Sequence, residues 1–160
     1  MRYDKGPLGA LMDEYERAAN EYIRGIGAVA PESYDLILNP DSEDPVSCKG
    51  ITSHVIGAGY GYANGIRIAF GMTLDVPEQY YPDPSEWPSQ PEIPLAVQAM
   101  LDYTIQTLDG HWSMTDDEIN EKLIPMRWKE RYDLESLLEH AIVHILRHRR
   151  QIERLTSPAR

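Results

Sequence analysis

The sequence predicts an all-α protein, a four-helix bundle with long crossover connections. Four segments repeat apolar residues at intervals near 3.6, as the buried face of a helix requires. No segment alternates apolar and polar residues convincingly enough for a strand. Two of the connections between the helical segments are long. The expected helices span 9–29, 47–71, 93–110 and 133–158, and the 160 residues suffice for one domain, 1–160, with one core.

The first expected helix, 9–29, has an apolar stripe at helical spacing and stops near Gly25 and Gly27. The segment that follows it, 31–48, is rich in proline, aspartate and serine. Such a composition predicts a loop, with room for one turn of helix.

The second expected helix, 47–71, begins at Ser47 as its N-cap and is apolar along most of its length. We therefore expect it to be buried on most sides. It contains five internal glycines, each costing on the order of 1 kcal/mol relative to alanine. Close packing against another helix and open space for a ligand both explain such glycines, and the sequence leaves both explanations open.

The segment 75–94 contains six prolines and is expected to form neither helix nor strand. Its aromatic residues Tyr80, Tyr81 and Trp87 indicate that it packs onto the rest of the protein. The third expected helix, 93–110, follows this connection directly.

The connection 111–133 contains Thr115 followed by Glu118, a capping-box pattern that predicts a short helix. The fourth expected helix, 133–158, begins at Asp133 as its N-cap.

Composition argues against several classes of function. The net charge is −11, and basic residues cluster only in the short stretch RHRRQIER, so no nucleic-acid partner is expected. No window approaches the ~18 apolar residues of a membrane span, and the N-terminal segment carries acids where a signal peptide is apolar. Cys48 is the single cysteine and is read as an ordinary thiol, which together with the absence of a signal peptide favours a cytoplasmic protein.

Three of the five histidines, His140, His144 and His148, are spaced four residues apart in the last expected helix. Residues four apart on a helix are neighbours, whereas residues eight apart lie about 12 Å apart along the axis. One metal ion can therefore be bound by His140 with His144 or by His144 with His148, but not by all three. A third ligand must come from elsewhere, either His54 or His111.

His54 lies in the apolar second helix, where a buried histidine needs a hydrogen bond or a metal ion. Gly57, Ala58 and Gly61 follow on about the same helical face, where small residues would line a pocket beside His54. Gln151 lies one turn after His148, where it is expected either to reach toward the site as a hydrogen-bond donor or to be a plain polar residue at the rim of the bundle.

A surface role is the competing interpretation of the histidine row. Arg147, Arg149 and Arg150 surround His148, and cations near the C-terminus of a helix are favourable without any ligand. These charges also oppose metal binding unless the arginines point away from the site.

The string HILRHRRQI, 144–152, resembles the last-helix signature of the DinB/YfiT-like superfamily. That signature has two histidines separated by three residues, then a basic residue and Gln or His before Ile, with a partner histidine on the second helix. The resemblance implies an up-down-down-up bundle in which His54, His144 and His148 bind a divalent metal ion, most often zinc or nickel. It leaves His140 as a neighbouring histidine or an alternative ligand.

The resemblance also implies a function. We expect an enzyme that acts on a small molecule by metal-activated water, as a hydrolase, or through a metal-bound thiol, as a thiol S-transferase. Many members of the superfamily are dimers, so a homodimer is expected. The alternative hypothesis is a non-catalytic metal-binding or structural helical protein, such as a dimeric stress-response protein. The acidic charge and the proline-rich segment 75–94 depart from the family pattern, and no catalytic residue or substrate is assigned.

Overall fold

The computed structural model describes residues 6–41, 46–80, 82 and 84–157 of the chain. Most of these residues are helical, and four of the helices are long, as the sequence predicts. The α-helices are α1 (Pro7–Gly27), α2 (Pro31–Tyr34), α3 (Cys48–Ala69), α4 (Ile93–Leu108), α5 (Asp116–Glu121) and α6 (Leu134–Thr156).

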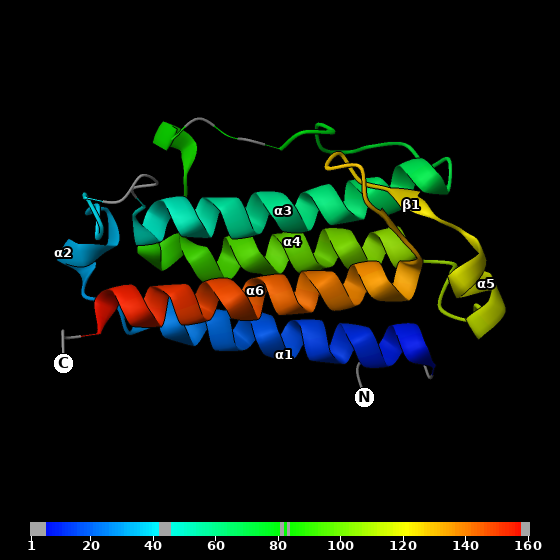
Figure 1. Ribbon diagram of the computed structural model, residues 1–160, viewed down its shortest axis with the longest axis horizontal. Coiled ribbons are helices and arrows are strands. Elements are labelled where there is room, and N and C mark those ends of the chain that lie inside the picture. The colour runs from blue at the N-terminus through cyan, green and yellow to red at the C-terminus, as the bar shows by residue number, and fades with distance from the viewer. Residues whose placement is uncertain (1–5, 42–45, 81, 83, 158–160) are drawn as a thin grey trace.

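The four long helices lie side by side (Figure 1). Helix α1 packs against α6 and α4, and α3 packs against α4 and α6. The colours of Figure 1 show that α1 and α6 run in one direction and that α3 and α4 run in the other. One hydrophobic core joins buried residues of all four helices. No helix of the described residues is long and apolar enough to cross a membrane.

Three helices, α3, α5 and α6, begin at the N-caps that the sequence indicates, whereas α1 begins at Pro7, two residues before its expected start. The Ser47 side chain accepts a hydrogen bond from the Gly50 N–H at 3.0 Å, which caps α3. Asp133 caps α6 in the same way, through the N–H of Ser136 at 2.7 Å. Thr115 forms the predicted capping box with Glu118 at the start of α5.

A short antiparallel hairpin corrects the expectation that the chain contains no strand. Strand β1 (Ile124–Pro125) pairs with β2 (Arg131–Tyr132), and Lys129 in the turn between them has a φ of 72°. Two residues per strand are too few for an alternating pattern to be visible in the sequence. The hairpin places its turn residues beside α3, where they contribute to the site described below.

The connection between α3 and α4 returns along the outside of the helices (Figure 1). It contains two 3₁₀ helices, η1 (Pro84–Glu86) and η2 (Gln90–Glu92), which the high proline content did not lead us to expect. Proline fits the first turn of such a helix because the N–H it lacks has no partner there.

Aromatic residues hold this connection against α3. Tyr80 packs against Tyr60 with ring centroids 4.7 Å apart, and Trp87 lies beside Gly50. The prediction that the segment packs onto the body is confirmed for Tyr80 and Trp87, whereas Tyr81 lies outside the described residues.

Candidate metal centre

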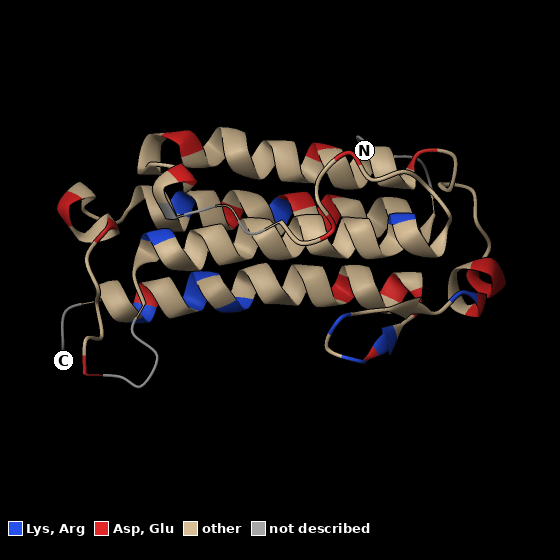
Figure 2. Cartoon of the chain, turned by 90° about the horizontal axis from the view of Figure 1, so that it is seen from above, with Lys and Arg blue, Asp and Glu red and all other residues tan. Residues whose placement is uncertain are grey.

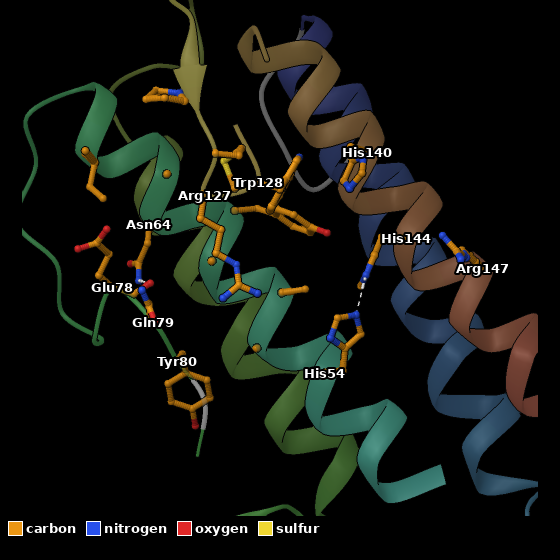
Figure 3. A pocket seen from close by; sticks show the side chains of 18 residues that line it. His54, Asn64, Glu78, Gln79, Tyr80, Arg127, Trp128, His140, His144 and Arg147 are labelled. Carbon is orange, nitrogen blue, oxygen red and sulfur yellow. Dashed lines mark hydrogen bonds between the residues drawn. The ribbon is translucent and has the colours of Figure 1, made fainter. Parts of the chain in front are cut away.

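Three histidines from two helices face one another. His54 comes from α3, and His144 and His148 come from α6, which packs against α3. One ligand nitrogen from each ring lies within 4.8 Å of the other two. The Nε2 atoms of His54 and His144 are 3.1 Å apart (Figure 3). The rings of His144 and His148 are also adjacent, with centroids 4.5 Å apart.

These distances suit a metal ion bound by nitrogen. Two nitrogen ligands at about 2.0–2.1 Å from a tetrahedral Zn²⁺ lie about 3.3 Å from each other. The 3.1 Å between the Nε2 atoms of His54 and His144 is close to that value, and it also permits a direct hydrogen bond between the rings. The three histidines therefore lie close enough to hold a metal ion.

The surroundings keep all three imidazoles neutral near pH 7. Burial, followed by repulsion from His148 and His54 when these rings are protonated, lowers the pKa of His144 to about 3. His54 is exposed on one side, but desolvation of its ring by the neighbouring side chains, followed by the charges of Arg127 and Arg147, lowers its pKa. Burial also lowers the pKa of His148. A neutral ring keeps a lone pair on one nitrogen, which is the form that binds a metal ion.

Gln151 determines which nitrogen of His148 carries the hydrogen. Its Oε1 atom lies 2.8 Å from Nδ1 of His148, so Gln151 reaches the site as expected, but as an acceptor and not as a donor. A carbonyl oxygen only accepts hydrogen bonds, so Nδ1 is the donor and Nε2 keeps its lone pair. Gln151 thus holds His148 in the tautomer that a metal ion requires at Nε2.

The other two histidines lie outside this cluster. His140 stacks on Trp128, with ring centroids 5.9 Å apart, and its ring centroid is 6.2 Å from that of His144. His111 lies against Phe70, with ring centroids 4.6 Å apart, and is not among the three clustered histidines. The register in which His144 and His148 pair with His54 is the one that the resemblance implies.

His54 is exposed, which corrects the expectation that it is buried. It lines an open pocket of about 360 Å³ between α3, α6, the hairpin and the proline-rich connection. Gly57, Ala58 and Gly61 line the same pocket, as their positions in the sequence predict. Figure 3 shows the pocket extending from the histidines toward Tyr80.

The sequence left two explanations for the glycines of α3, close packing and open space for a ligand, and each applies to some of them. A Cβ atom at Gly57 would lie 2.8 Å from the backbone oxygen of Tyr80, and one at Gly65 would lie 2.9 Å from the sulfur of Met126. A Cβ atom at Gly61 would meet nothing within 4 Å. Close approach of other segments therefore explains Gly57 and Gly65, whereas Gly61 borders open space.

The three arginines near His148 differ in whether they line the pocket. Arg149 forms an ion pair with Glu21 of α1 at 2.5 Å, away from the pocket. Arg150 is exposed and does not line the pocket. Arg147 does line it, so one positive charge of this cluster stays beside the histidines. Figure 2 shows that the basic residues of α6 gather in its second half.

Sequence reasoning missed the contribution of the hairpin. Arg127 and Trp128 line the pocket, and both lie in the turn between β1 and β2. Glu78 lines it from the connection between α3 and α4. No sequence pattern marked these residues, because their place depends on how two irregular segments fold back onto α3.

Comparisons with protein-family models, with curated proteins and with solved structures found no match to this chain, so its function is inferred from the geometry of the site.

Proposed function

We propose that the chain is a metal-dependent enzyme of the DinB/YfiT-like type, an up-down-down-up four-helix bundle that binds one zinc or nickel ion through His54, His144 and His148. The observation that supports this proposal is the convergence of three neutral imidazoles from α3 and α6 at the wall of an open pocket. The directions of the four long helices agree with it.

When bound to three neutral histidines, such an ion supplies a Lewis acid with a coordination position left for water or a thiol. The residues of the chain have separate tasks around it. Gln151 orients His148, and Gly61 and Ala58 leave space in which a small substrate approaches the histidines. This arrangement serves both reactions that the resemblance implies, hydrolysis and thiol transfer.

A non-catalytic role is the second candidate. The 3.1 Å contact between His54 and His144 joins α3 to α6, so a metal ion there would also cross-link two helices. A purely structural site, however, is closed by its ligands, whereas His54 is exposed and borders a cavity of about 360 Å³. The open cavity favours the enzyme.

Metal content and affinity test the site. We expect the purified protein to bind one zinc or nickel ion per chain, measured by mass spectrometry of metals and by the visible spectrum of the Co²⁺ form. His54→Ala, His144→Ala and His148→Ala should each weaken binding by more than the roughly 10–100-fold that losing a supporting contact costs. His111→Ala and His140→Ala are matched controls and should bind as the wild type does.

Two results would contradict parts of this proposal. A wild-type protein that takes up none of these ions has no metal site, and loss of binding in His140→Ala but not in His148→Ala shifts the site by one helical turn. A panel of esters, amides and thiol acceptors then tests catalysis. Turnover that survives unchanged in metal-free His54→Ala would show that the metal is not catalytic.

A further inference from the structure

Two arginines reach the pocket from different elements. Arg127 extends from the turn between β1 and β2 toward His54, and Arg147 comes from α6, three residues after His144 (Figure 3). Both arginines line the same pocket as His54 and His144. The two cationic groups therefore lie around the histidines and not on a remote surface.

The charge of the pocket is opposite to that of the chain. The net charge of the chain is −11, yet the charged residues that line the pocket are two arginines and one acid, Glu78. Glu78 lies on the side of the pocket away from the histidines (Figure 3). Three neutral imidazoles also leave the charge of a divalent ion unbalanced. Positive charge gathered in a partly enclosed cavity attracts anions more strongly than it does in open water.

The rest of the wall beside these charges is largely apolar. Trp128 is 40% exposed and lies edge-on to Tyr62, with ring centroids 6.1 Å apart. Met126 and Ile68 line the same region. The cavity of about 360 Å³ is at the small end of the range for sites that bind small molecules. It suits a compact apolar or aromatic body.

We infer that the pocket binds a small organic anion, whose carboxylate or phosphate group contacts Arg127 and Arg147 and whose apolar body lies against Tyr62 and Trp128. Guanidinium groups present paired N–H donors that match the oxygens of either anion. This inference rests on the proposed function for the metal ion and adds the class of substrate. The arginines would hold the anion so that its neighbouring bond lies near the histidine centre.

Titration calorimetry with three probes of similar size tests the inference. The probes are phenylacetate, phenylphosphonate and the neutral phenylacetamide, each added to zinc-loaded and to metal-free protein whose metal content is measured in the same sample. We expect at least one of the two anions to bind at least about tenfold more tightly than the amide, the advantage of a charged hydrogen bond. Comparison of the carboxylate with the phosphonate then identifies the anionic group.

Arginine variants separate the pocket from general charge attraction. Arg127→Gln and Arg147→Gln should each weaken anion binding by roughly tenfold and leave amide binding unchanged. Arg150→Gln removes an exposed charge of the same helix outside the pocket and is the matched control. If the variants lose the same anion affinity relative to the wild type in metal-free protein, the arginines, and not the metal ion alone, select the anion.

The outcomes distinguish this inference from the proposed function. A protein that loads zinc but binds the amide as tightly as both anions, or binds neither anion, contradicts the inference and leaves the metal site intact. A protein that takes up no metal but prefers anions through Arg127 and Arg147 contradicts the proposed function alone. If Arg150→Gln loses as much anion affinity as the two pocket variants, the preference is due to the general positive charge of α6, and the anion site is wrong.

Discussion

Arg67 and His54 are both polar residues of α3, but the chain encloses one and leaves the other at a cavity. Arg67 is 5% exposed, and its guanidinium donates to Thr107 Oγ1 at 2.8 Å, to the Thr73 carbonyl at 3.0 Å and to Asp75 at 2.5 Å. His54 is exposed, and its Nε2 faces a ring that offers the same kind of nitrogen.

The region around Arg67 also positions one wall of the pocket. Its guanidinium lies 4.1 Å from the centre of the Tyr103 ring, and the Tyr103 hydroxyl donates to Asn64 Oδ1 at 2.7 Å. Asn64 Nδ2 in turn donates to the carbonyl of Pro77 at 2.9 Å, three residues before Tyr80. The proline-rich connection is thus tied to α3 by hydrogen bonds.

The two regions teach what distinguishes a structural polar group from a binding one. Arg67 is a donor surrounded by acceptors of the same chain, so its hydrogen bonds stabilise the fold. The three histidines instead bring like ring nitrogens together, close enough to hold a metal ion. Around Arg67, a donor is surrounded by acceptors. Around His54, similar ring nitrogens face one another beside a cavity.

The largest expected effect follows from removing the enclosed group. Arg67→Met should lower the free energy of unfolding by about 2–4 kcal/mol, because it removes the buried hydrogen bond to Thr107 Oγ1 and the partly buried one to the Thr73 carbonyl, both from a charged donor. Asp75 is 65% exposed, so its ion pair adds little to this value. Urea unfolding measures the change.

Arg150→Met is the control for that variant, because it removes an exposed arginine of α6 and should change stability by less than about 0.5 kcal/mol. Equal effects of the two variants would show that the enclosed network contributes no more than a surface residue. Arg67→Met should keep its metal affinity per folded molecule, since none of the three histidines contacts Arg67.

Much of the helical framework could be predicted because its signals are local. Ser47, Thr115 and Asp133 cap helices through side chains that lie within three residues of their partners. The spacing of His144 and His148 likewise places both rings on one face of a single helix. Spacing alone left both His54 and His111 as partners, and the apolar helix around His54 together with the resemblance favoured His54.

Only the α3 wall of the pocket could be predicted, from the small residues on the face that carries His54 and Gly61. The other walls come from irregular segments whose position no periodicity reveals. The hairpin that supplies Arg127 has two residues in each strand, and Lys129 in its turn adopts a positive φ that its residue type does not favour. Such contacts depend on tertiary packing.

A smaller expected effect is the pH dependence of the metal-free protein. The pKa of His144 is lowered to about 3, mainly by burial, whereas in the unfolded chain it returns to about 6.5. Below about pH 6.5 the unfolded state therefore binds a proton that the folded state does not. The contribution of His144 to the free energy of unfolding is therefore fully present above about pH 6.5. It is lost as the pH decreases toward 3, by up to about 1.4 kcal/mol per pH unit.

Urea unfolding in chelator between pH 7.5 and pH 5.5 measures this slope before most carboxylates titrate. His144→Gln should show a shallower slope, because its amide does not take up a proton. His111→Gln, which replaces a histidine outside the cluster, is the matched control for the substitution itself. A slope that does not change in His144→Gln would mean that the enclosed position of this ring does not affect stability.

The smallest expected effect compares two glycines one turn apart in α3, both at the pocket wall. Gly61→Ala adds a methyl group that meets nothing within 4 Å, so the helix propensity of alanine should raise the free energy of unfolding by about 0.5–1 kcal/mol. Gly57→Ala gains the same propensity, but its methyl group would lie 2.8 Å from the Tyr80 carbonyl oxygen, so the proline-rich connection must shift. We expect Gly57→Ala to be less stable than Gly61→Ala by about 1 kcal/mol or more in urea unfolding. Equal gains in the two variants would mean that this connection does not press on α3, and that the wall of the pocket opposite the histidines is free to move.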